Sequence, residues 1–174
     1  WADAMDAWLK NADELGIPFV ATLMGHERVI ARKNYFNLIG SYGNREANWA
    51  VQNCDLLIVI GARLDVRQTG SDVEDFARNA QIVQIDIDPA QLNNRVQAEL
   101  NICATAEDFF NSFPISRNTF PNLDASWLIE LVKQRKQAET NEYADWEISP
   151  SQVMKKLNDV LSKQAVDYVC DVGN

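Results

Sequence analysis

Two short segments of the sequence combine residue types that could hold a ligand. Gly61-Ala62-Arg63 follows an apolar run; glycine there lets the backbone approach a ligand closely, and Arg63 offers a planar guanidinium for a phosphate. Asp86 and Asp88 end the next apolar run, where a carboxylate can accept hydrogen bonds from a ribose. The structural alternatives are a turn glycine with a solvated arginine, and an aspartate that caps a helix. We favour Asp86 over Asp88 as the ligand residue.

A second glycine-rich loop runs from Gly40 to Gly43, just before a predicted helix. The N–H groups at a helix N-terminus can bind an anion, although an ordinary connecting loop explains the same residues. The dinucleotide fingerprint G-x-G-x-x-G is absent, which argues against a standard NAD site. Asp65 and Arg67 are expected to pair with each other for structural reasons. His26 is the sole histidine, so neither a histidine-based catalytic arrangement nor a zinc site is expected.

The composition limits the class of protein and its partners. The chain has 174 residues, of which 47% are apolar, so it can hold one domain plus additional segments. A net charge of −9 argues against nucleic acid and anionic membranes as main partners, because phosphate backbones select Lys and Arg clusters. No apolar run reaches the roughly 18–20 residues that span a bilayer, and no signal peptide is expected. The three widely spaced cysteines are expected to be reduced thiols of a cytoplasmic protein.

Predicted helices and strands alternate along the first two thirds of the chain. Helices are predicted at residues 1–15, 45–53, 71–79 and 105–110, and a helix is also expected to begin at Asp88-Pro89. Strands are predicted at residues 17–22, 56–60, 82–87 and 100–103, whereas residues 26–43 show no clear period. This alternation predicts an α/β fold with a doubly wound, mainly parallel sheet and flanking helices. The loops that follow the strands then share one edge, where open α/β sheets bind ligands.

The chain changes character after residue 113. Residues 114–125 have the mixed polar composition of a linker, a helix is predicted at residues 127–138, and residues 139–148 are polar again. Ser149-Pro150-Ser151-Gln152 predicts another helix start, followed by a strand at residues 166–170 and a strand-end loop at residues 171–174. We therefore expect a domain at residues 1–113, an interdomain linker with one helix at residues 114–148, and the truncated start of another domain at residues 149–174.

Several segments together resemble the central domain of acetolactate-synthase-type thiamine diphosphate enzymes. They are IPFVATLMG (17–25), GSYG (40–43) leading to ANWAV (47–51), CDLLIVIGARLDVRQTG (54–70) and IDIDPAQL (85–92). These segments occur in the family's order. The turn Asp171-Val172-Gly173 is similar to the end of the first strand of the family's pyrophosphate-binding domain. The resemblance implies a Rossmann-like central domain that is incomplete at both ends, with the family's first strand expected before Trp1.

The resemblance implies that the parent protein is a three-domain enzyme, a transferase or lyase, that decarboxylates a 2-keto acid and passes the carbanion equivalent to an acceptor. Thiamine diphosphate and Mg²⁺ would be held by the other two domains, so this fragment alone is expected to be inert. The central domain would hold FAD as a structural group, or ADP, or nothing. The residues that would line that groove by position are Leu23, Met24, Gly25, Gly40, Gly43, Gly61, Ala62, Arg63, Asp86 and Ile87.

The chain departs from the family pattern Arg-Phe-Asp-Asp-Arg-Val-Thr-Gly. In the corresponding RLDVRQTG segment, Val66 replaces an acid and Gln68 replaces an apolar residue, and this variant looks closer to relatives associated with bacterial surface-polysaccharide synthesis. One alternative hypothesis is a non-catalytic FAD- or ADP-binding structural module. Another is an interaction fragment. The expected partners are the remaining domains of the parent enzyme and further copies in a homodimer or homotetramer.

Overall fold

The computed structural model describes residues 2–120, 124–141 and 148–164. The chain divides into two compact units, Trp1–Ala138 and Glu139–Asn174. Along the chain the elements are α1 (Ala2–Leu15), β1 (Phe19–Ala21), η1 (Leu23–Gly25), α2 (His26–Val29), β2 (Tyr35–Leu38), α3 (Arg45–Asn53), β3 (Leu56–Ile60), α4 (Val66–Thr69), η2 (Val73–Asp75), β4 (Gln81–Asp86), β5 (Leu100–Cys103), α5 (Ala106–Ser112), α6 (Ala125–Asn141) and α7 (Pro150–Leu161).

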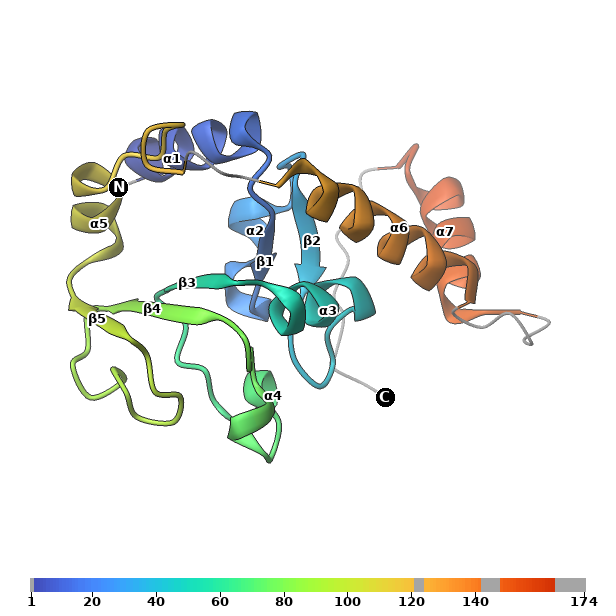
Figure 1. Ribbon diagram of the computed structural model, residues 1–174. Helices are drawn as coiled ribbons and strands as arrows, with labels where there is room; N and C mark the ends of the chain where they lie inside the picture. The colour runs from blue at the N-terminus through green and yellow to red at the C-terminus, as the bar shows by residue number, and fades with distance from the viewer. Residues whose placement is uncertain (1, 121–123, 142–147, 165–174) are drawn as a thin grey trace. The chain divides into compact units, whose positions relative to one another are not determined.

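All strand pairings in the described residues are parallel. β1 pairs with β2, and a second sheet has the order β3-β4-β5 (Figure 1). The register of the second sheet is regular, from Leu56 opposite Gln81 to Ile60 opposite Ile85. Parallel strands with flanking helices confirm the predicted α/β class with a parallel sheet. Instead of one continuous sheet, the described strands form two sheets.

The two sheets contribute side chains to the same two hydrophobic cores. Phe19 of β1 packs with Ile58 of β3 in one core, whereas Val20 of β1 packs with Val59 of β3 in the other. Successive residues of a strand point to opposite faces, so the alternation means that both faces of the strands are covered. This double burial explains why the strands have unbroken apolar runs in the sequence.

Helices α1 and α5 lie side by side and cover the first core (Figure 1). Trp8 of α1 packs against Phe109 and Phe110 of α5 with ring centroids 6.2 and 5.3 Å apart, and its indole N–H donates to the carbonyl of Phe113 at 2.9 Å. α5 begins where predicted because the Thr105 hydroxyl accepts a hydrogen bond from the N–H of Asp108 at 3.0 Å. The two helices thus cover one face of the strands, and α3 packs on the opposite face.

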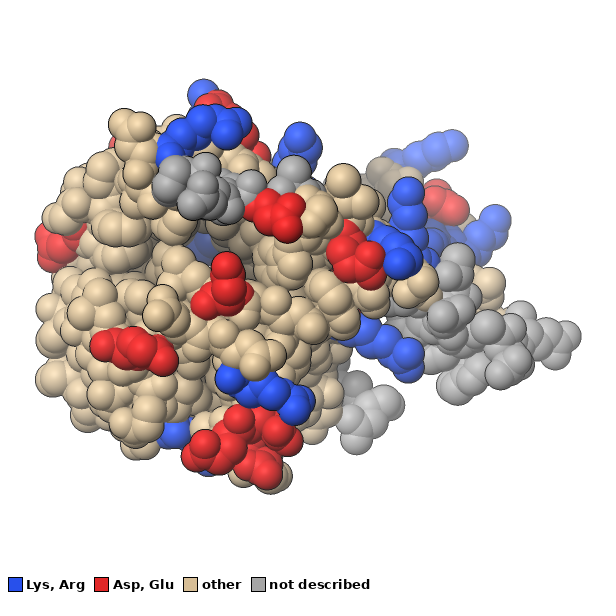
Figure 2. Space-filling view, in the orientation of Figure 1, with Lys and Arg blue, Asp and Glu red and all other residues tan. Residues whose placement is uncertain are grey.

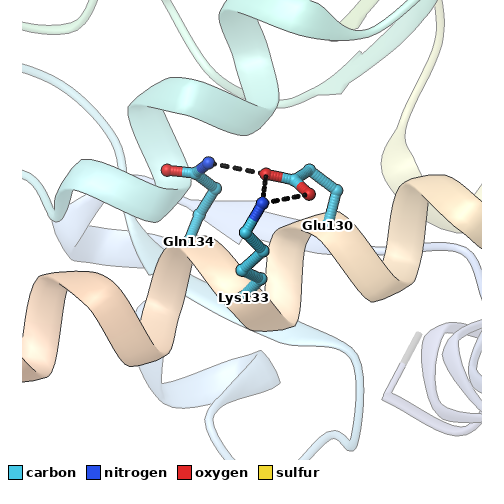
Figure 3. Close-up of polar contacts among 3 residues, drawn as sticks. All are labelled: Glu130, Lys133 and Gln134. Carbon is cyan, nitrogen blue, oxygen red and sulfur yellow. Dashed lines mark hydrogen bonds and ion pairs between the residues drawn. The ribbon is translucent and has the colours of Figure 1, made fainter.

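Helix α6 packs against β2 and α3 of the first unit through its buried residue Leu131. Leu131 is fully buried in a small core with Phe36 of β2 and Ala50 of α3. On another side of α6, Glu130 accepts hydrogen bonds from Lys133 and Gln134, at 3.3 and 2.8 Å (Figure 3). The hydrogen bond from Gln134 and then the one from Lys133 lower the pKa of Glu130 below its ordinary value.

Two predicted helices are wrong, and both segments instead bond to or pack into the core of the fold. Residues 71–79 form the short η2 and turns, with Phe76 and Ala77 both buried and Ala77 at φ 47°. The segment after Asp88 forms only turns. The buried side chain of Gln84 donates to the carbonyl of Gln91 at 3.1 Å and accepts from the N–H of Asn93 at 3.2 Å. These bonds use backbone groups that a helix would need.

Residues 26–43 contain two elements that the sequence did not indicate, α2 and β2. In the second unit, α7 begins with the predicted capping box: Ser149 Oγ accepts from the N–H of Gln152 at 3.2 Å, and Gln152 Oε1 accepts from the N–H of Ser149 at 3.0 Å. The strand predicted at residues 166–170 and the loop at residues 171–174 lie outside the described residues. Within the described ranges, no helix has the length and apolar character needed to cross a membrane.

Candidate functional site

The loop after β3 presents Arg63 beside an open glycine. The N–H of Gly61 donates to the carbonyl of Ile85 at 2.8 Å, which extends the β3-β4 pairing by one residue. Gly61 has φ +62°, and a Cβ added to it would meet no atom within 4 Å, so the space beside it is free. Leu64, the residue after Arg63, is buried in the hydrophobic core and so holds the loop to the sheet. The exposed Arg63 side chain has no hydrogen-bond or ion-pair partner among the described residues.

Helix α4 follows this loop and is capped by Asp65. The carboxylate of Asp65 accepts a hydrogen bond from the backbone N–H of Arg67 at 2.8 Å. The predicted pairing of Asp65 with Arg67 therefore occurs through the backbone, and the predicted ion pair is absent from the part of the chain that the structure describes. The guanidinium of Arg67 stays exposed. Two unpaired cations, Arg63 and Arg67, thus stand in the segment after β3.

The two aspartates after β4 have different environments. Asp86 is 7% exposed, and its Oδ1 accepts from the N–H of Asp88 at 2.9 Å. Asp88 is exposed, and both of its oxygens serve the turn: Oδ1 accepts from the N–H of Ala90 and Oδ2 from the side chain of Gln91. Asp88 therefore caps a turn rather than a helix. Asp86 keeps one carboxylate oxygen without a described partner and is the better ligand candidate of the two.

The glycine loop after β2 is joined to α4. The N–H of Ser41 donates to the carbonyl of Arg67 at 2.8 Å, and Asn48 of α3 holds Gly40 through hydrogen bonds at 2.8 and 2.9 Å. Gly40 has φ +103°, and a Cβ added there would lie 2.4 Å from the Arg67 carbonyl oxygen. At Gly43 an added Cβ would lie 2.3 Å from the Leu38 carbonyl oxygen. These glycines are needed for loop packing, which the sequence pattern alone did not distinguish from anion binding.

A pocket of about 180 Å³ lies where this loop, α3 and the end of α4 meet. Its lining residues are Ile39, Gly40, Ser41, Asn48, Val51, Gln52, Gln68, Thr69, Gly70 and Phe76. The N-terminus of α3 beside it already carries an anion: Glu46, in the first turn, is 3% exposed and accepts a hydrogen bond from Asn37 at 2.6 Å. A second anion bound at this helix end would meet a like charge, which argues against an anion site at the Gly40–Gly43 loop.

Large apolar side chains are exposed in the loops after four successive strands. Leu23 and Met24, in η1 after β1, are 63% and 90% exposed. Tyr42 follows β2, Val66 follows β3, and Ile87 follows β4, and all three are exposed as well. No hydrogen bond between described residues joins η1 to the loops after β3 and β4. Loops at the carboxyl ends of strands that expose such side chains are typical of a surface that another group covers.

Sequence analysis missed the residues that hold the loops of this site in place. Gln84 is 2% exposed and organises the segment after β4, and Arg95, in that segment, reaches to the end of α4. A polar residue inside the apolar run 82–87 was an available signal for Gln84. No sequence pattern marks Arg95, because its partners are more than 20 positions away.

The two described cysteines differ in burial. Cys103 is exposed, whereas Cys54 is buried and its thiol donates to the Val51 carbonyl at 3.2 Å. Burial raises the pKa of Cys54 from 9.0 to about 11; the neighbouring Asp55 also raises it, and a backbone hydrogen bond opposes the shift. Neither cysteine belongs to a metal cluster, since the described residues contain no group of three His, Cys, Asp or Glu side chains that could hold an ion.

We expect stability to fall in alkaline solution partly through Cys54. Above pH 9 the unfolded chain loses the thiol proton, while the folded chain keeps it up to about pH 11, so the free energy of unfolding decreases across this interval. Urea unfolding at pH 8, 9 and 10 should show a shallower decrease for Cys54→Ala than for the unchanged chain. Parallel decreases in the two proteins would contradict this assignment.

Charged side chains are scattered over the face of the protein that Figure 2 draws. On the face drawn in Figure 2, acidic and basic side chains over the first unit lie in small separate groups, and no continuous basic patch is visible.

The matched family model decides what kind of domain carries this site. Residues 1–113 match the model of the thiamine pyrophosphate enzyme central domain. The chain belongs to the thiamine pyrophosphate enzyme family. It is 30% identical over 167 residues to a probable acetolactate synthase large subunit of Methanocaldococcus jannaschii, covering 92% of this chain and 27% of the archaeal protein. This central domain is thus the part of the family to which the loops after β1 to β4 belong.

Two further relatives agree with this assignment. An acetolactate synthase large subunit of Cyanidium caldarium is 31% identical over 169 residues, which cover 93% of this chain and 28% of the algal protein. Acetolactate synthase 1 of Zea mays is 31% identical over 157 residues, covering 87% of this chain and 24% of the plant protein. The chain therefore spans about a quarter of the length of these curated relatives.

Proposed function

We propose that this chain is the central part of an acetolactate-synthase-like enzyme and serves there as a structural nucleotide-binding domain. The match of residues 1–113 to the central-domain model carries the proposal. In the whole enzyme, thiamine diphosphate with Mg²⁺ would supply the electron sink for decarboxylating a 2-keto acid. The groups that hold it would come from the other domains. This chain alone, given thiamine diphosphate and Mg²⁺, would not turn over pyruvate, and measurable turnover would contradict the proposal.

The bound nucleotide in this proposal is FAD or ADP. The chemistry of the side chains after β3 and β4 supports it: the unpaired guanidinium groups of Arg63 and Arg67 suit a diphosphate. The free space beside Gly61 suits a close backbone approach. The remaining oxygen of Asp86 suits a ribose hydroxyl. None of these groups is consumed by contacts within the described structure.

The exposed apolar side chains after the strands support a ligand or partner with a large apolar surface. Met24, Tyr42 and Ile87 are between 69% and 90% exposed, which is costly for the chain alone if they form a contiguous surface. A flavin ring or a neighbouring domain would remove them from water. Of the two nucleotides, only FAD carries a ring that would cover these side chains, which is why FAD stands before ADP in this proposal.

We also propose that a strand from the rest of the protein completes the sheet. β1 and β3 are the inner edges of the two sheets and share both cores, yet no pairing joins them among the described residues. A parallel strand between β1 and β3 would give the order β2-β1-x-β3-β4-β5 of a doubly wound fold. The remaining domains of the parent enzyme, and further copies in a homodimer or homotetramer, are the partners in this proposal.

Calorimetric titration of the chain with FAD and with ADP tests the nucleotide proposal. We expect FAD to bind, and Arg63→Ala to weaken binding by roughly 10-fold to 100-fold through loss of hydrogen bonds to a charged group. The matched control is Arg78→Ala, which removes an exposed arginine that pairs with Asp75 and was not predicted to line the groove. Binding of ADP without FAD would overturn the flavin assignment. Binding of neither would overturn the nucleotide proposal for this chain.

A further inference from the structure

Arg95 lies in the segment between β4 and β5 and contacts the end of α4. Its Nε donates to the Thr69 hydroxyl at 2.8 Å, and its Nη2 donates to the carbonyl oxygens of Gly70 at 2.6 Å and Ser71 at 3.3 Å. The fork of a guanidinium can make these bonds at once, whereas a lysine ammonium has no matching planar geometry. One side chain thus joins the loop after β4 to the loop after β3.

The contacts continue from α4 to the glycine loop after β2. Thr69 is 7% exposed and its hydroxyl also donates to the Asp65 carbonyl at 3.1 Å, so Arg95 and the start of α4 share one hydroxyl. The Arg67 carbonyl on α4 in turn accepts the Ser41 N–H at 2.8 Å. A shift of α4 would therefore move the backbone against which the Gly40 loop rests.

The segment that carries Arg95 is itself fixed to the sheet. The buried side chain of Gln84 binds Gln91 and Asn93, and the Asn93 side chain accepts from the N–H of Ala98 at 2.7 Å. The backbone that carries Arg95 is therefore held to β4 by side-chain hydrogen bonds. A cation held on a rigid base can position the loop to which it binds.

We infer that Arg95 is a positioning residue that sets the relative placement of the three loops after β2, β3 and β4. It acts through Thr69, Gly70 and α4, and it need not touch a ligand. The placement of the loops is a property of the chain itself, while its importance for FAD or ADP binding rests on the proposed function.

Hydrogen exchange of the unliganded chain tests the placement directly. In Arg95→Met we expect the N–H groups of Gly70 and Ser41 to exchange about tenfold faster, as expected for loss of hydrogen bonds from a charged group. The N–H groups of Gly61 and Gln81, which bond within the β3-β4 sheet, should keep their protection. Arg78→Met is the control, because it removes an arginine of equal charge whose ion pair with Asp75 stays within its own segment.

Each result decides the inference. If Ser41 exchanges at an unchanged rate in Arg95→Met, the inference is overturned. It is also overturned if Gly61 and Gln81 lose as much protection as Ser41, because that result means general destabilisation. Arg95→Lys should restore protection only in part. If the unchanged chain binds FAD or ADP, Arg95→Met should weaken that binding at least as much as Arg95→Lys does. Equal affinities of the unchanged chain, Arg95→Met and Arg95→Lys would also overturn the inference. If it binds neither, the proposed function fails while exchange alone decides the role of Arg95.

Discussion

Gly40→Ala should destabilise the first unit by about 3 kcal/mol, because two penalties fall on the same residue. At φ +103° the backbone is in a region that an alanine rarely adopts. The new methyl group would lie 2.4 Å from the carbonyl oxygen of Arg67, which is backbone and cannot rotate away. The Ser41–Arg67 hydrogen bond would have to yield. Urea unfolding followed by tryptophan fluorescence measures the loss.

Gly61→Ala is the matched control for this prediction. Gly61 also has a positive φ, of +62°, but an added methyl group there meets no atom within 4 Å. The expected loss is therefore the conformational penalty alone, about 1–2 kcal/mol. Equal losses in the free energy of unfolding for Gly40→Ala and Gly61→Ala would mean that the contact with Arg67 contributes nothing. The packing of the Gly40 loop against α4 would then be wrong.

Leu131→Ala should cost about 2–5 kcal/mol of the free energy of unfolding. Leu131 is 0% exposed and packs with Phe36 and Ala50, so the truncation removes buried methyl groups and leaves a cavity between α6 and the elements it packs against, β2 and α3. Arg135, one turn further along α6, adds a hydrogen bond to the Tyr35 carbonyl and lies 4.2 Å from the centroid of the Phe36 ring. A loss of this size would mean that α6 belongs to the cooperative folding unit.

Ile129→Ala provides the comparison on the same helix. Ile129 is 70% exposed, so its truncation should change the free energy of unfolding by no more than about 0.5 kcal/mol. Both substitutions put the same residue into the same helix, and propensity effects therefore largely cancel. Similar small effects for Leu131→Ala and Ile129→Ala, measured by the same urea titration, would show that α6 does not pack as described.

The candidate site could be predicted in parts but not as an assembly. The sequence pointed to Gly61-Ala62-Arg63 and Asp86 because strand ends are visible as apolar runs that stop at a glycine or a carboxylate. It could not show that both oxygens of Asp88 bond within its own turn, or that Glu46 in the first turn of α3 is buried and bonded to Asn37. Those facts depend on which side chains are buried and bonded. The assignment of the groove residues to a ligand stays a prediction.

The sequence by itself determined the local elements that depend on periodicity and caps, namely β3, β5, α3 and the start of α7. It also determined the family, because several motifs in the right order are specific together. The tertiary structure alone decided the turns around Ala77 and after Asp88, the join of Ser41 to Arg67, and the reach of Arg95 across two loops. The reason is physical: periodicity and capping act within one or two turns of chain, whereas buried polar groups find their partners wherever folding brings them.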